Sequence, residues 1–412
     1  MQATHFRQSL ALLFSRRFGT FWFATLLANI GTWAQQMAQP WLMLSLGASP
    51  FLLGLDSFAM GAPVMLLTLV GGSLADRGDR RRIIALFQSI QMMCPVLLVG
   101  LILTHAIQPW MVIMLSLIVG ITDALSMPSF QSIVPSIVSK DQIPSGIALN
   151  STQFNLSRIL GPALAGVLIA SMGMAGAFAL SAVSYLPFIL VALWVLPPSA
   201  PMPTPARLLN HHQLWANVRE VLREPFLRGA LLTVFITGSL CAPLITFSPI
   251  LVKEVFHGGA AQFSTALGAF GIGGLLGASG LLAMDPQRDR RPISTFFAMT
   301  YGAVVVGAAL NPWGWGLPAL LVLAGIAMTA SNASANALLQ SNAPARIRGQ
   351  TVSLFMLSMR GSMALGSLFS GMTVHLLGVR QALLINGVLA LTAQFWVGRT
   401  WARAGRAPFT QK

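Results

Sequence analysis

Charged residues are scarce in this sequence. Asp, Glu, Lys and Arg make up 8% of its 412 residues, whereas an ordinary soluble protein carries about 25%. This scarcity excludes a soluble globular protein, and the 55% share of hydrophobic residues gives a mean hydropathy of +0.72. Cysteine is nearly absent, since only Cys94 and Cys241 occur, both inside apolar segments. They provide neither a disulfide framework nor metal-ligand spacing, so we expect two packing residues, no metal and no cofactor.

Acidic residues are the scarcer charge. The 10 Asp and Glu residues stand against 25 Lys and Arg residues, which gives a formal net charge of +15. The basic residues are dispersed in short clusters between apolar segments rather than gathered on one domain. That distribution is typical of the loops of a membrane protein, so we expect no nucleic-acid partner.

Long apolar segments are abundant. A hydrocarbon core about 30 Å thick needs roughly 20 apolar residues per helical span, so twelve spans take about 240 residues and fit the chain. The predicted spans cover residues 18 to 46, 51 to 74, 83 to 104, 109 to 132, 145 to 171, 175 to 196, 226 to 252, 261 to 284, 292 to 311, 315 to 340, 350 to 377 and 381 to 400. The sequence therefore predicts an all-α membrane protein, with twelve transmembrane helices in two pseudo-symmetric six-helix bundles.

A proline-rich segment, residues 197–225, separates the two halves. Its polar second part has apolar spacing that suits an amphipathic helix, either on the membrane surface or packed on the loops. We expect the chain to divide into a cytoplasmic N-terminus, two bundles joined by a cytoplasmic linker, and a cytoplasmic tail. These parts cover residues 1–17, 18–196, 197–225, 226–400 and 401–412.

The distribution of Lys and Arg predicts an orientation. Only Lys253 and Arg380 fall on one side of the predicted spans, while Arg158 and Arg360 fall inside spans. All the other basic residues fall on the opposite side, which the positive-inside rule assigns to the cytoplasm. Both termini then lie in the cytoplasm, and the number of spans is even.

Short motifs recur at an offset of about half the chain. The Asp-Arg-Arg run at 79–81 returns at 289–291, and Arg158 returns as Arg360. The glycine pair at 161 and 166 returns at 366 and 371. Internal repeats of six spans, related by an axis along the membrane normal, are a transporter architecture.

The strongest local signal is the loop at residues 71–82, with the sequence GGSLADRGDRRR. Its two glycines allow neighbouring helices to approach closely, and its alternating charges indicate a tight cytoplasmic turn. The alternative is a loop that only sets topology, but topology does not require Asp76 and Asp79.

This loop resembles that of the major facilitator superfamily, and the resemblance spans nearly the whole chain. In that family the loop latches the cytoplasmic face when the transporter opens outward. The resemblance implies gate roles here for Gly72, Asp76, Arg77, Arg80 and Arg81. The second copy, residues 285–291, is degenerate because Pro286 and Gln287 are inserted, which puts an equal role there in doubt.

Within the superfamily the chain resembles bacterial transmembrane secretion effectors of the enterobactin-exporter and drug:proton antiporter type. The resemblance rests on residues 31–36, on Asp123 and its surroundings, and on residues 148–166. The last run is similar to the fifth-span motif of antiporters, which it matches at Gly161, Pro162 and Gly166. It implies export in exchange for protons, although the fourth span lacks the arginine that many proton antiporters carry there.

Four charged residues fall inside predicted spans: Asp56, Asp123, Arg158 and Arg360. An ionisable group at bilayer depth is costly unless it is paired or hydrated. Asp123 either pairs with the Arg77 to Arg82 loop and locks the gate or binds a proton. Asp56 is either a proton carrier or a wet surface residue. Each arginine lies at mid-depth, where it can meet a carboxylate, a carbonyl oxygen or an anionic substrate.

Two predicted spans carry polar stripes. The first presents Asn29, Trp33 and Gln36 at i, i+4 and i+7, and the tenth presents Asn332 and Asn336 at i and i+4. Polar stripes in lipid face either protein or a water-filled cavity. The resemblance implies cavity lining, because these two spans line the cavity in that family. With the two arginines inside spans, these residues form the expected substrate path.

We predict a secondary active transporter that exports a siderophore, drug or hydrophobic metabolite across the bacterial inner membrane by alternating access and proton antiport. One alternative is an uptake or facilitative carrier of the same superfamily. Another is an integral-membrane enzyme, which would need converging His, Cys or acidic residues that the predicted spans do not offer. We therefore expect no catalytic residues. The expected partners are the small-molecule substrate, protons and lipid, and we expect a monomer.

Overall fold

The computed structural model describes residues 11–139, 142–198, 218–282, 284, 289–344 and 348–403. All the elements that it assigns over these residues are helices. This confirms the predicted all-α class, and the physical reason is that a helix satisfies its backbone N–H and C=O groups internally in hydrocarbon. Most of the predicted linker helix, at residues 199–217, lies outside the described residues.

The helices are long in both parts of the chain. The first part forms α2 (Phe18–Ser45), α3 (Pro50–Arg77), α4 (Arg80–Leu103), α5 (Pro109–Gln131), the short α6 (Val134–Ile137) and α7 (Ile143–Trp194). The second part forms α9 (Pro225–Ile236), η2 (Thr237–Cys241), α10 (Pro243–Ile250), η3 (Leu251–Val255), α11 (Ala260–Leu282), α12 (Arg290–Leu310), α13 (Gly316–Asn342), α14 (Arg348–Leu377) and α15 (Val379–Arg403).

Nine segments of the described chain are long and apolar enough to cross a membrane. One of them, Pro225–Val255, unites α9, η2, α10 and η3 in a single span. The other long helical arms of the described chain are α2, the first arm of α7 and α14, and each carries several polar residues. With these arms the described residues account for the twelve predicted spans.

A single glycine divides α7 into two arms. Gly173 has φ 69° and ψ −170° inside the 52-residue helix, a backbone conformation that glycine adopts without steric cost. It lies between the predicted spans at 145–171 and 175–196. The two spans are therefore joined without a loop, and we refer to them as the first and second arms of α7.

The span Pro225–Val255 contains two π-helical segments, η2 and η3. Pro243 lies two residues after the last residue of η2, and Pro249 lies two residues before the first residue of η3. Proline has no N–H to donate to the carbonyl oxygen four residues earlier. The backbone hydrogen bonds of the helix therefore shift locally to residues five apart, and the Ala242 N–H donates to the Thr237 carbonyl oxygen at 3.0 Å. The sequence predicts one span at residues 226 to 252, and its hydropathy gives no sign of either π segment.

The structure groups into two compact units. Unit 1 takes residues 1–48, 62–207 and 260–268, and unit 2 takes the rest. Because α3 and α11 contribute residues to both units, the predicted division into two six-helix bundles at 18–196 and 226–400 stays a prediction.

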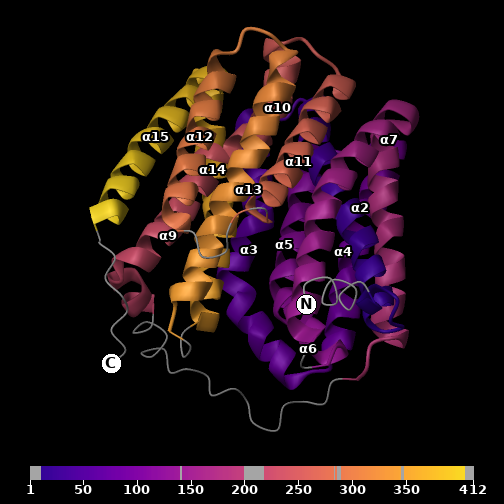
Figure 1. The fold of residues 1–412 in the computed structure, drawn as a ribbon. Helices are drawn as coiled ribbons and strands as arrows, with labels where there is room; N and C mark the ends of the chain where they lie inside the picture. The colour runs from indigo at the N-terminus through magenta and orange to yellow at the C-terminus, as the bar shows by residue number, and fades with distance from the viewer. Residues whose placement is uncertain are drawn as a thin grey trace. The chain divides into compact units, whose positions relative to one another are not determined.

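In unit 1, α2 runs beside both arms of α7 (Figure 1). A Cβ atom added at Gly31 would lie 2.9 Å from the Ser181 Cα, and one added at Gly161 would lie 2.5 Å from the Trp33 Cβ. The backbones therefore approach so closely that only hydrogen fits between them. Helices in lipid gain stability from this kind of close packing, because lipid itself provides no hydrophobic driving force between them.

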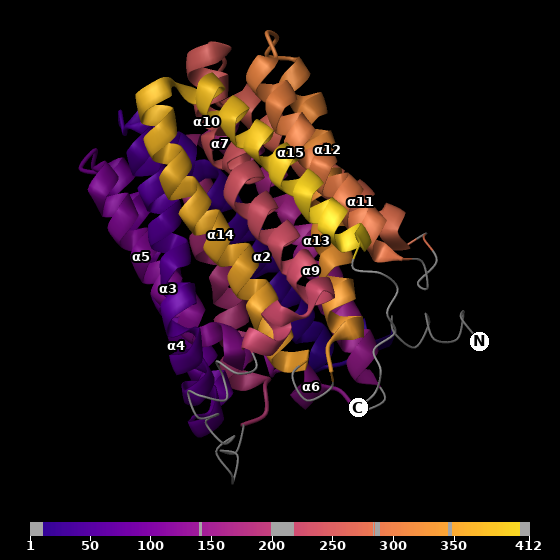
Figure 2. The same cartoon turned by 90° about the vertical axis from the view of Figure 1, so that its left-hand side faces the viewer.

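In unit 2, α9 lies between α14 and α15, and α12 packs along α13 and α15 (Figure 2). Two serines join α12 to α13 through reciprocal bonds, in which each Ser294 and Ser331 hydroxyl donates to the other's carbonyl oxygen at 3.1 Å. A Cβ atom added at Gly366 of α14 would lie 2.5 Å from the Ser239 Cα, so α14 crosses the span at η2 with backbones in contact.

Arg380 is one of the two basic residues that the topology count placed away from the others. Its Nη2 donates to the carbonyl oxygen of Asn311 at 2.8 Å, and Asn311 is the C-cap residue directly after α12. A cation at this position satisfies an orphan carbonyl and interacts favourably with the helix dipole. Arg380 thus has a capping role within unit 2.

The first prediction concerns the seam between α2 and α7. We expect Gly31→Ala to lower the midpoint of thermal unfolding of the purified protein, since overpacking costs about 1–3 kcal/mol. The matched control is Gly100→Ala in α4, where an added Cβ meets nothing within 4 Å and helix propensity favours alanine by about 1 kcal/mol. Equal midpoints for the two variants would contradict a tight seam at Gly31.

Candidate functional site

The loop motif has the same local geometry in both copies. Asp79 precedes α4 and accepts a hydrogen bond from the backbone N of Arg81 at 3.2 Å, and its carboxylate binds the Arg81 guanidinium at 2.8 Å. Asp289 precedes α12 and accepts from the Arg291 backbone N at 3.0 Å, with the guanidinium at 2.9 Å. Each aspartate is an N-cap, and the arginine two residues later closes over it.

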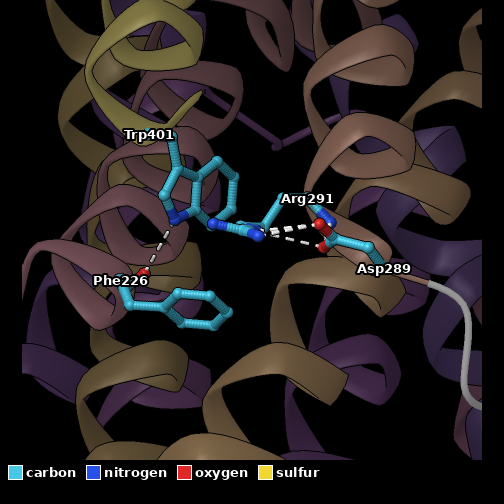
Figure 3. Close-up of polar contacts among 4 residues, drawn as sticks. All are labelled: Phe226, Asp289, Arg291 and Trp401. Carbon is cyan, nitrogen blue, oxygen red and sulfur yellow. Dashed lines mark hydrogen bonds and ion pairs between the residues drawn. The ribbon is translucent and has the colours of Figure 1, made fainter. Parts of the chain in front are cut away.

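The second copy continues into an aromatic cluster. The Arg291 guanidinium lies over the Phe226 ring at 5.0 Å, and its side chain is only 16% exposed. The Trp401 indole N–H donates to the Phe226 carbonyl oxygen at 3.1 Å. Figure 3 shows Arg291 reaching from Asp289 toward these two rings, which come from the start of α9 and the end of α15. Arg291 therefore joins α12 to α9 and α15 within unit 2.

Around the first copy, one glycine makes the close approach. A Cβ added at Gly71 would lie 2.5 Å from the Ala124 carbonyl oxygen of α5, whereas one added at Gly72 meets nothing within 4 Å. The Arg80 Nε donates to the Ala75 carbonyl oxygen at 3.3 Å, which ties the loop back to α3. The expectation that both glycines serve close approach is therefore wrong for Gly72.

Several predicted residues lie outside what the structure describes. The side chains of Asp76 and Arg77 in the loop are not among the described residues, and neither are those of Arg158 and Pro162 in α7. Their roles stay predictions. The ion pairs described for Arg81 and Arg82 are both with Asp79, and Asp123 is half-buried on α5.

Asp56 is buried. Its relative exposure is 5%, so the alternative of a wet surface residue is wrong. Burial of a charged carboxylate is costly unless the carboxylate is paired or hydrated. The role of Asp56 as a proton carrier stays a prediction.

The polar stripe of α2 makes ordered contacts with α7. The Asn29 amide donates to the Gln153 Oε1 at 3.2 Å, and the Trp33 ring lies 6.0 Å from the Phe154 ring. Gln36 is half-buried on the same helix. The predicted residues Asn29 and Trp33 therefore face the first arm of α7 at adjacent turns.

A second polar face of α2 was missed by the sequence analysis. The Gln35 Oε1 accepts from the Ser181 hydroxyl at 2.8 Å, and the Gln39 amide donates to the Ser116 hydroxyl at 2.6 Å. Both glutamines are below 9% exposed. Their i, i+4 spacing was the available signal, and the two hydrogen bonds show that this face makes interhelical contacts.

The stripe on α13 is only partly satisfied internally. The Gln340 amide donates to the Asn336 Oδ1 at 3.0 Å. The Asn332 Oδ1 is buried and has no hydrogen-bond donor among the residues described. Buried acceptors usually have a partner such as water or a ligand, and the place of Asn332 in the substrate path stays a prediction.

The remaining predicted residues lie on α7 and α14. Gly161 packs on α2 as described above. Gly166 faces Ser264 within unit 1, since a Cβ atom added at Gly166 would lie 2.6 Å from the Ser264 Cβ. Arg360 is half-buried on α14. Among the described residues, no three His, Cys, Asp or Glu side chains are placed to hold a metal ion.

The family model described as transmembrane secretion effector matches residues 7–407. The staphyloferrin A transporter of Staphylococcus aureus is 23% identical over 91% of this chain and 94% of that protein. The multidrug efflux pump Tap of Mycolicibacterium fortuitum is 26% identical, over 80% and 82%. The enterobactin exporter EntS of Salmonella typhimurium is 27% identical, over 73% and 72%.

Solved transporter structures resemble this fold over nearly their whole length. A bacterial homologue of the human lysosomal transporter Spinster has a TM-score of 0.68 at 18% identity, covering 97% of this chain and 99% of that one. A POT family transporter in complex with 5-aminolevulinic acid has a TM-score of 0.74 at 13% identity, covering 94% and 96%. At these identities the likeness shows the fold alone, and it confirms the predicted architecture.

The second prediction concerns the Arg291 cluster. We expect Phe226→Leu to lower the thermal unfolding midpoint, because a desolvated cation–π contact contributes about 2 kcal/mol or more. The matched control is Phe395→Leu, which removes the ring under Arg399 at 4.6 Å, where Phe395 is 52% exposed. An exposed contact contributes only about 0.5–1 kcal/mol. If Phe395→Leu lowers the unfolding midpoint as much as Phe226→Leu does, the Arg291 cluster stabilises the protein no more than an exposed contact.

Proposed function

Because the chain belongs to the transmembrane secretion effector family of the major facilitator superfamily, we propose that it exports a small molecule across the bacterial inner membrane by alternating access. The cargo is a siderophore, a drug or another hydrophobic metabolite, and the driving force is proton antiport. That the chain is a membrane transporter follows from the family and the fold. The direction, cargo and coupling are our proposal.

The observation that carries the direction is the set of relatives. Two of the three relatives described above are named for efflux or export, and two are named for siderophores. The alignments cover more than 70% of each relative. All three are named as transporters, exporters or pumps, which favours transport over the membrane-enzyme alternative.

The polar residues at span depth support a substrate path. Asn29 and Trp33 on α2, and Asn332 and Asn336 on α13, lie at depths where polar groups need protein or water as partners. The buried Asn332 Oδ1, which lacks a donor among the described residues, is a candidate contact for cargo. Arg158 and Arg360 are proposed to attract anionic groups of the substrate.

For proton coupling we propose Asp56 and Asp123. Asp56 is 5% exposed, and buried acids within membrane spans are typical of proton relays in pumps and transporters. Asp123 lies on α5, one residue before Ala124, whose carbonyl oxygen is the close neighbour of Gly71. This position at the α3 crossing supports a link between its charge and the loop.

We propose that the two loop copies have different roles. The first copy, with Gly72, Asp76, Arg77, Arg80 and Arg81, is the cytoplasmic gate. In the second copy, Arg291 is engaged by Asp289 and Phe226 within unit 2. That engagement supports a role as a structural anchor rather than as a second gate.

Orientation and assembly complete the proposal. Both termini lie in the cytoplasm, as the excess of Lys and Arg on one side of the spans suggests. The protein works as a monomer, with the lipid bilayer, the substrate and protons as its partners.

The third prediction tests export and its coupling. Energised cells that express the protein should accumulate less of a siderophore or an efflux dye than vector-only cells, and a protonophore should abolish the difference. Asp56→Asn and Asp123→Asn should lose the dependence on the gradient, because neither amide binds and releases a proton at working pH. Protonophore-insensitive efflux by the wild type would refute antiport, and greater accumulation would indicate uptake.

The fourth prediction concerns the intramembrane arginines. We expect Arg158→Gln and Arg360→Gln to reduce efflux of an anionic cargo at least tenfold, since a charge-assisted hydrogen bond contributes about 1.5–3 kcal/mol. Efflux of a cationic dye should change less, and membrane levels of each variant should be measured alongside. If anionic efflux is unchanged in both variants, neither arginine belongs to the path.

A further inference from the structure

Unit 1 carries an aromatic pair at span depth. The rings of Trp33 on α2 and Phe154 on α7 lie 6.0 Å apart with their planes at 68°, an edge-to-face arrangement. Phe154 is 40% exposed, and Trp33 is half-buried. Part of each ring therefore remains uncovered, and ring faces and edges of this kind attract a further aromatic ring.

Side-chain amides occur within one helical turn of each of these two rings. On α7, Asn150, Gln153 and Phe154 occupy positions i, i+3 and i+4, which share one face of the helix. Gln153 is 1% exposed and accepts from the Asn29 amide at 3.2 Å. The Asn150 Oδ1 is buried and has no hydrogen-bond donor within the described part of the chain. Buried acceptors are rarely left in that state, so this oxygen is suited to a donor from a ligand.

A second aromatic pair on α2 provides the contrast. Trp22 and Phe23 also meet edge to face, with ring centroids 4.9 Å apart and planes at 85°. The Trp22 indole N–H is satisfied by the Leu149 carbonyl oxygen at 2.8 Å, and Phe23 is 52% exposed. An exposed phenyl ring of this kind suits lipid, whereas the amides beside Trp33 and Phe154 require protein, water or a polar ligand.

The position of Trp33 is set before any ligand arrives. Gly161 of α7 lies against it, since an added Cβ would lie 2.5 Å from the Trp33 Cβ and 2.9 Å from the Ile30 carbonyl oxygen. The backbone of α2 therefore cannot shift toward α7 at this turn. Binding groups that are held in place lose less entropy when a ligand binds.

We propose that Trp33, Phe154 and Asn150 form a binding site for an aromatic ring that carries an O–H or N–H donor. The ring packs against the uncovered parts of Trp33 and Phe154, and its donor bonds to the Asn150 Oδ1. This inference rests on the proposed transport function, and it adds the chemical class of the cargo. It assigns Phe154 and Asn150 to the site in addition to the residues of the polar stripe.

The test is equilibrium binding to the purified full chain in lipid nanodiscs, with empty nanodiscs to subtract partitioning. Three matched probes separate the two contacts. They are 4-phenylphenol, which has aromatic rings and a donor; 4-methoxybiphenyl, which has aromatic rings and no donor; and 4-cyclohexylcyclohexanol, which has a donor and only saturated rings. We expect 4-phenylphenol to bind more tightly than each analogue by about 2- to 12-fold, the range that one such contact provides.

Variants then assign the contacts. Phe154→Leu and Trp33→Leu should weaken 4-phenylphenol by about 2- to 12-fold and leave 4-cyclohexylcyclohexanol unchanged. Trp33→Phe, which keeps a ring, should retain most of the affinity. Asn150→Leu should remove the preference for 4-phenylphenol over 4-methoxybiphenyl. The control is Phe23→Leu, which removes a ring from the other aromatic pair and should bind as the wild type does.

Each outcome decides the proposal. Equal binding of the three probes by the wild type overturns it, as does unchanged binding in Phe154→Leu and Trp33→Leu. A loss of all three probes in Trp33→Leu that Trp33→Phe does not restore also counts against it. Binding is measured without a gradient, so absence of efflux in cells would refute the proposed export while a selective site would still stand.

Discussion

The structure of unit 1 depends on the close approach of α2 to both arms of α7. At Gly31 and Gly161 the backbones meet with no room for a side chain. In lipid no hydrophobic effect holds helices together, so association relies on such packing and on hydrogen bonds between helices. Gln35 and Gln39 add those bonds on the buried face of α2. Asn29 and Trp33 lie on another face of α2, where they contact the first arm of α7.

The loop copies illustrate how a repeat diverges. Asp79 and Asp289 cap their helices in the same way, so the motif has a shared structural role at each helix start. The difference arises from what lies next to the arginine. Arg291 meets Phe226 and is largely buried, whereas Arg81 is bonded to Asp79 alone among the ion pairs described. An arginine that already binds a carboxylate and a ring within unit 2 is poorly placed to bind a further partner.

Much of the architecture could be predicted, because membrane spans are long, apolar and internally hydrogen-bonded. The spans, the Asp-Arg-Arg repeat and the stripe with Asn29 and Trp33 followed from pattern alone. The π segments were missed because hydropathy does not report hydrogen-bond register. The burial of Asp56 was missed as well, because a single acid in an apolar segment gives the same sequence pattern whether its side chain faces protein or solvent.

The sequence by itself determined the all-α membrane class, the number of spans and the positions of the polar residues along each helix, because these depend on local composition and helical period. The tertiary structure alone decided which polar side chains are hydrogen-bonded to neighbouring helices, such as that of Gln35. It also decided which buried acceptors lack donors among the described residues, such as the Oδ1 atoms of Asn332 and Asn150. It also decided that Gly71 rather than Gly72 meets α5. The physical reason is that contacts between helices depend on rotation and crossing point, and neither is encoded in the hydropathy of one helix.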